Sequence, residues 1–106
     1  MGRKIRLRKD TDDETVFWCA GGVGILREEV WVNEKEEVVR YNLAFLLPHL
    51  FAADNGRVLG YDNAHGVHEC HFMGQVKPVE FHEYSATAMH FYREAEAIRR
   101  SYKEKE

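Results

Sequence analysis

The chain of 106 residues has few of the residues that mark several classes of protein. It contains two cysteines, Cys19 and Cys70, and only two prolines, and it has no Ser/Gly-rich run. This composition argues against long disordered segments. No apolar run approaches the length of a membrane span, and no signal-peptide pattern follows Met1. We therefore expect a cytoplasmic protein with reduced cysteines and no membrane contact.

The net charge of −3 is too small to indicate an acidic or basic partner. Hydrophobic residues make up 44% of the chain, with two Trp, five Tyr and six Phe, which is enough for a folded core. Length and composition together predict one domain over residues 1–106.

Alternating apolar residues and turn residues predict β-structure over about residues 3–84. We expect strands at 3–9, 15–19, 23–32, 38–47, 58–61 and 76–84, with an acidic solvated turn at 10–14. Gly21-Gly22, the segment 33–36 and Asn55-Gly56 are typical of turns. Tight connections between strands favour an antiparallel sheet.

After residue 84 the apolar period changes to three and four, which is typical of an amphipathic helix. Ser85 is the expected N-cap of a helix over about 86–103. Its apolar stripe is predicted to be Ala88, Met89, Tyr92, Ala95, Ile98 and Tyr102. The predicted fold class is thus α+β, a single antiparallel β-sheet of five to seven strands with a long C-terminal helix packed on one face.

The polar segment after residue 61 carries the candidate site. His65, His68 and His71 follow Asp62 and Asn63 at equal spacing. In a regular strand, His68 would share a face with Cys70, and His71 would share the other face with Glu69. Convergence of the histidines therefore needs a loop, which Gly66 makes plausible. We expect Asp62 to lie near at least one of the three imidazoles.

Three interpretations of this segment stay open. Imidazoles and a carboxylate could bind zinc, iron or manganese, with His65, His68, His71 and Asp62 as the candidate ligands. They could instead perform general acid–base chemistry on a phosphodiester. The third interpretation is a set of surface histidines without chemistry. Folding should require no metal, and Cys70 is expected to be a core residue rather than a nucleophile.

The order of motifs resembles the TumE-like family, the toxin components of bacterial and archaeal toxin–antitoxin modules. The resemblance rests on Tyr41-Asn42, on the turn at Asn55-Gly56, and on Tyr61-Asp62-Asn63-Ala64-His65 followed by spaced histidines. It covers roughly residue 38 to the end, and Gly60 stands where that family usually has an arginine. The resemblance implies a helix-turn-helix antitoxin as partner and activity on RNA.

The leading hypothesis is therefore a toxin that acts as a ribonuclease. His65 or His71 would be the general acid or base, Asp62 would orient an imidazole, and Asn63 would hydrogen-bond a phosphate or base. The alternatives are a non-enzymatic binding protein, with the same residues as an antitoxin or small-ligand interface, and a His-based metal-binding module. Exposed edge strands make a homodimer an additional expectation.

Overall fold

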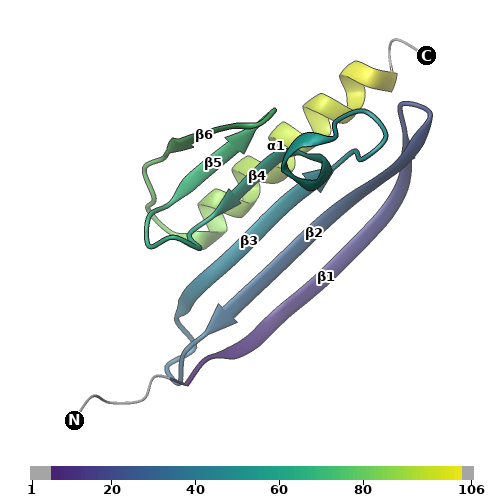
Figure 1. Cartoon of the computed structure of the whole chain (residues 1–106). Helices are drawn as coiled ribbons and strands as arrows, with labels where there is room; N and C mark the ends of the chain where they lie inside the picture. The colour runs from purple at the N-terminus through teal and green to yellow at the C-terminus, as the bar shows by residue number, and fades with distance from the viewer. Residues whose placement is uncertain (1–5, 104–106) are drawn as a thin grey trace.

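The predicted α+β class is confirmed by a computed structural model that describes residues 6–103. One six-stranded antiparallel sheet has the strand order β1-β2-β3-β4-β5-β6, and helix α1 packs against one of its faces (Figure 1). Each strand therefore pairs only with its neighbours in sequence. The elements are β1 (Arg8–Cys19), β2 (Gly22–Val32), β3 (Val38–Leu46), η1 (Ala53–Gly56), β4 (Arg57–Asp62), β5 (Glu69–Phe72), β6 (Gln75–Pro78) and α1 (Tyr84–Lys103).

The first strand differs most from the prediction. β1 runs without a break through residues 10–14, where an acidic turn was expected. Its partner β2 continues the pairing, and Glu14 lies opposite Arg27 with their side chains 2.7 Å apart. An edge strand exposed to solvent tolerates charged side chains, so the acidic run does not end it. A strand was expected at 3–9, but β1 begins only at Arg8, and residues 6 and 7 precede it. Residues 3–5 lie outside the described part of the chain.

The turns expected at Gly21-Gly22, 33–36 and Asn55-Gly56 are found at or next to those positions, whereas the acidic turn expected at 10–14 is not. Ala20 and Gly21 both have positive φ between β1 and β2, as a tight hairpin turn requires. Asn33 closes the next turn, where its side-chain oxygen accepts hydrogen bonds from the backbone amides of Lys35 and Glu37. Between β3 and β4, the short turn η1 holds Asp54 and Asn55 in the left-handed region.

The core lies between α1 and the middle of the sheet. Tyr41, Leu43 and Phe45 from β3, Leu59 from β4 and Phe91 from α1 are almost completely buried. Cys70 is also in this core, as predicted. No helix covers the opposite face of the sheet in residues 6–103 (Figure 1). We call this uncovered side of β2–β5 the open face.

The helix begins at Tyr84, slightly before the expected position, and two residues of the predicted stripe are wrong. Met89 is 56% exposed and Tyr92 is 40% exposed, whereas Phe91 and Ala95 face the core. Phe91 lies three residues after Ala88 and four before Ala95, so the buried stripe runs through it.

The last predicted strand, 76–84, is also too long, because β6 ends at Pro78. After Pro78 the chain leaves the sheet. The ring of Phe81 then stacks on His68, with 3.9 Å between centroids.

Candidate functional site

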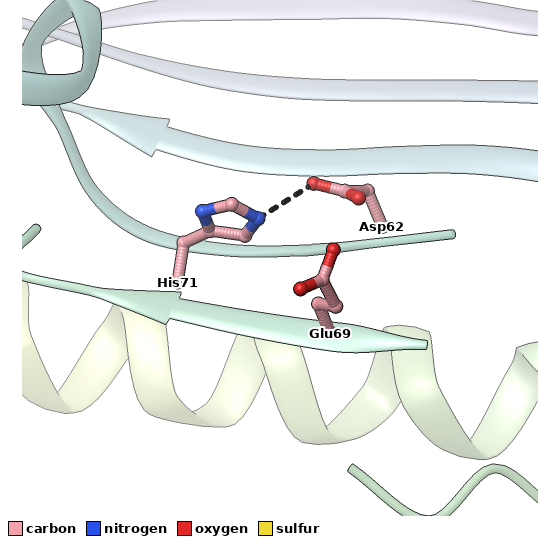
Figure 2. A group of neighbouring side chains, drawn as sticks. All are labelled: Asp62, Glu69 and His71. Carbon is pink, nitrogen blue, oxygen red and sulfur yellow. Dashed lines mark ion pairs between the residues drawn. The ribbon is translucent and has the colours of Figure 1, made fainter. Parts of the chain in front are cut away.

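The open face presents a cluster of ionisable side chains from the β4–β5 hairpin. In the register of this hairpin, Asp62 lies opposite Glu69, and Gly60 lies opposite His71. Residues that are paired, or two apart on one strand, share a face. Their neighbours Tyr61 and Cys70 belong to the core on the helix side. Asp62, Glu69 and His71 therefore all project from the side away from α1, as Figure 2 shows.

His71 is the buried centre of this cluster. Its Nδ1 lies 2.9 Å from Nη2 of Arg57, and its Nε2 lies 3.0 Å from Oδ2 of Asp62. Arginine has only donors, so Nδ1 must accept and the imidazole carries its proton on Nε2. The Nε2 atom is close to Asp62 but makes no aligned hydrogen bond, and it is shielded from solvent. The resting site thus holds a buried imidazole nitrogen without a partner.

Arg57 organises the surroundings of His71. Its guanidinium binds both carboxylate oxygens of Asp54, at 2.9 and 3.1 Å, and its Nη1 donates to Oδ2 of Asp62 at 3.2 Å. The side chain passes over Gly60, where an added Cβ would lie 2.6 Å from Cδ of Arg57.

The other predicted site residues lie apart from His71. His65 is exposed, and its Nδ1 lies 3.3 Å from Oε1 of Glu69. His68 faces the core side, where its Nδ1 is hydrogen-bonded to the hydroxyl of Tyr41 at 2.8 Å. The structure therefore brings together Asp62 and His71 but neither of the other two histidines.

The side chain of Asn63 is used by the fold. Its Oδ1 accepts from the backbone amide of Tyr41 at 3.0 Å, and its Nδ2 donates to the carbonyl of Val39 at 2.8 Å. These two bonds tie the end of β4 to β3.

Sequence reasoning missed three members of the cluster: Asp54, Arg57 and Glu69. Glu69 could have been found, because it shares a strand face with His71 at a spacing of two. Arg57 reaches the site along its own strand, across a glycine, and Asp54 reaches it through the left-handed turn η1. Neither of these contacts has a periodic signal in the sequence.

The cluster could hold a metal ion. One donor atom from each of Asp62, Glu69 and His71 lies within 4.8 Å of the other two, and within residues 6–103 no other such group occurs. The sequence predicted four candidate ligands, His65, His68, His71 and Asp62. Of these four, only Asp62 and His71 belong to the group. With Asp54 included, the cluster has three carboxylates and one guanidinium, Arg57, which pairs with Asp54 and Asp62, so the carboxylates are in excess.

A groove of about 190 Å³ adjoins the cluster on the open face. Arg57 and Asp54 line it on one side, and Arg27 and Asn42 line it on the other. A larger depression of about 610 Å³ lies along α1, but its lining includes no histidine and only one carboxylate, Glu96. The open-face groove therefore leads to Arg57 and Asp54, the two side chains that lie next to Nδ1 of His71.

Two side chains near the cluster, on the helix side of the sheet, favour their neutral forms. Burial raises the pKa of Tyr41 to about 12, and the charge of Asp62 adds to this effect. Burial likewise raises the pKa of the Cys70 thiol, which disfavours the nucleophilic thiolate. Both side chains therefore support the fold rather than the chemistry of the cluster.

No family model, curated protein or solved structure matches this chain. No helix in residues 6–103 is long and apolar enough to cross a membrane. The TumE-like resemblance thus stays a prediction, and the case for function rests on the chemistry of the open-face cluster.

Proposed function

We propose that the protein is the toxin of a toxin–antitoxin module and cleaves RNA with the Asp62–His71 pair. One observation carries the proposal: a buried imidazole nitrogen lies 3.0 Å from a carboxylate oxygen, and the same imidazole contacts Arg57 and Asp54, which line a groove on the open face. A carboxylate beside a histidine stabilises the imidazolium that forms when the histidine accepts a proton. The motif Tyr61-Asp62-Asn63-Ala64-His65 adds the resemblance to a toxin family.

In this mechanism His71 is the general base. Its Nε2, which is shielded from solvent in the resting site and must be uncovered for the reaction, accepts the proton of the ribose 2′-hydroxyl, and the 2′-oxygen bonds to phosphorus. The P–O5′ bond breaks, and the 5′-oxygen leaves with a proton from water. The products are a 2′,3′-cyclic phosphate and a 5′-hydroxyl. Asp62 stabilises the imidazolium, and Asn63 acts as a positioning residue that holds the end of β4 against β3.

The mechanism requires a change of tautomer at His71. A free Nε2 lone pair needs the proton on Nδ1, where Oδ2 of Asp54 is 3.5 Å away and can accept it. Arg57 now donates to Nδ1, so its Nη2 must first move. A phosphate oxygen entering the groove would compete for this guanidinium, because arginine binds phosphate strongly. Substrate binding would thus free the base.

The test is toxicity and RNA cleavage by His71→Ala and Asp62→Asn, with His65→Ala as the matched control. Loss of a general base lowers the rate by roughly 10²–10⁴-fold, so both site variants should lose toxicity while circular dichroism shows a folded chain. His65→Ala should stay toxic, because His65 is exposed and outside the pair. Folded site variants with full toxicity would refute the proposal, as would a parent that neither arrests growth nor degrades RNA. The non-enzymatic binding protein would then be the better hypothesis.

The remaining parts of the proposal concern assembly and location. We place the protein in the cytoplasm, with a helix-turn-helix antitoxin as its partner and RNA as its substrate. The edge strands β1 and β6 each have a row of unpaired backbone groups toward the outside of the sheet, which supports a homodimer.

A further inference from the structure

We propose that Asp62, Glu69 and His71 form a binding site for one divalent cation of the Mn²⁺ type. The first support is the distance between donor atoms. Two neighbouring ligands, each about 2.1 Å from an octahedral metal, lie about 3.0 Å apart. Nε2 of His71 and Oδ2 of Asp62 have this separation without an aligned hydrogen bond between them. The pair therefore has the spacing of two ligands of one ion.

The second support is the buried imidazole itself. The His71 side chain is only 9% exposed, and its Nε2 has no hydrogen-bond partner. Buried polar atoms in folded proteins nearly always have a partner, so an unpartnered nitrogen in a group with the donor atoms of Asp62 and Glu69 points to a ligand shared by all three. The charge of the cluster also favours a cation, because it contains three carboxylates, Asp54, Asp62 and Glu69, and one guanidinium, Arg57. A divalent cation would neutralise the excess.

The surroundings of His71 can also support a bound cation. A histidine that binds a metal through Nε2 keeps its proton on Nδ1 and donates it to a carboxylate or carbonyl. Oδ2 of Asp54 is the acceptor in reach, 3.5 Å from Nδ1. Cation binding would therefore replace the Arg57–His71 hydrogen bond by an Asp54–His71 hydrogen bond.

The donor set selects the class of ion. Two carboxylates and one imidazole suit Mn²⁺, which accepts both oxygen and nitrogen ligands, better than Mg²⁺, which prefers oxygen alone. No cysteine contributes, since Cys70 faces the core. Three protein ligands would leave positions for water or a phosphate oxygen.

The cation would regulate the proposed nuclease. A cation on Nε2 and a proton on Nε2 use the same lone pair, so His71 cannot be a base while it is a ligand. We therefore expect Mn²⁺ to inhibit RNA cleavage. This consequence rests on the proposed function, whereas cation binding does not, because it is measured without RNA.

The binding experiment uses the full chain without a histidine tag. Mn²⁺ is titrated into the protein, and the free ion is followed by electron paramagnetic resonance. We expect one site per chain and at least tenfold weaker binding in Glu69→Gln and His71→Ala. His82→Ala, which removes an exposed histidine elsewhere, should bind like the parent. Glu69 is on the margin of the cluster, so its amide variant should stay folded, and circular dichroism checks this.

Two results would overturn the cation site. One is equal Mn²⁺ affinity in the parent and in folded Glu69→Gln, and the other is an equal loss of affinity in His82→Ala. If Mn²⁺ binds at the cluster but accelerates cleavage, the site stands and the role of His71 as a base is refuted. Thermal unfolding gives a separate readout: Mn²⁺ should raise the midpoint, and the chelated protein should remain folded.

Discussion

At the scale of single residues, three similarly spaced histidines have three different environments. His65 is in solvent, His68 packs on the core side of the sheet, and His71 is buried on the open face. The difference follows from where β5 begins. Glu69 to Phe72 alternate between the two faces, so His71 and Cys70 point in opposite directions. Equal spacing in sequence therefore gave no common site.

The role of His68 leads to a prediction about stability. Its ring stacks on Phe81, and its Nδ1 is hydrogen-bonded to the buried hydroxyl of Tyr41. His68→Ala leaves this hydroxyl without a partner, which costs about 1–3 kcal/mol. Urea denaturation should show this loss in His68→Ala and no loss in His65→Ala. Equal unfolding midpoints for the two variants would contradict a structural role for His68.

The sequence allowed prediction of the pair Asp62–His71 only as one of several combinations. The alternation of β5 could exclude His68 from the face of His71, and it could have added Glu69. The contacts of Arg57 depend on Gly60, since any larger residue there would occupy the path of the arginine side chain. Such a contact depends on three-dimensional packing, and local sequence patterns do not contain it.

At the scale of elements, the turns with Asn or Gly were predictable, whereas the acidic turn and the strand ends were not. Asn33 and Asn55-Gly56 define their turns by local chemistry, which needs no partner. The acidic residues of β1 form a strand only because β2 is long enough to pair with them. The predicted buried stripe of the helix was wrong at Met89 and Tyr92, because apolar residues occur on more than one side of α1.

One carboxylate of the sheet links two tyrosines of α1 to β2. Glu28 of β2 accepts hydrogen bonds from the hydroxyls of Tyr84, at 2.5 Å, and Tyr92, at 2.8 Å. Glu28→Gln replaces two charge-assisted bonds by weaker ones and should lower the free energy of unfolding by about 1–2 kcal/mol.

Hydrogen exchange provides the measurement for Glu28→Gln. Backbone amides of α1 should exchange faster in this variant than in the parent. Glu34→Gln, in the exposed turn after β2, is the matched control and should exchange like the parent. An unchanged exchange rate in α1 would show that apolar packing at Phe91 and Ala95 alone holds the helix.

At the scale of the whole molecule, four tyrosines make the fold sensitive to alkali. Burial raises the pKa of Tyr41 to about 12, and it raises the pKa values of Tyr61, Tyr84 and Tyr92 above the usual 10.0. Hydrogen bonds to carboxylates add to the effect at Tyr61, Tyr84 and Tyr92. In the folded state these groups keep protons that the unfolded chain releases near pH 10.

The sign of the pH dependence follows from linkage. The stabilisation is complete below pH 10 and is lost as the pH rises toward 12. We predict that the free energy of unfolding falls steeply in this window and that most tyrosinate absorbance appears together with unfolding. Near-ultraviolet circular dichroism follows the fold in the same titration. Tyrosinate absorbance from more than one of the five tyrosines near pH 10, in a still-folded protein, would contradict this prediction.

The order of strands in the sheet has a consequence for synthesis of the chain. Every strand pairs with the one made just before it, and all three proposed ligands lie on the β4–β5 hairpin. Contacts between sequence neighbours form quickly, because little loop entropy must be lost. The open-face cluster can therefore assemble on a ribosome-bound chain as soon as residue 72 has emerged. Helix α1 is synthesised later and then packs on the opposite face of the sheet. The nascent protein therefore forms the open-face cluster before it reaches its full stability.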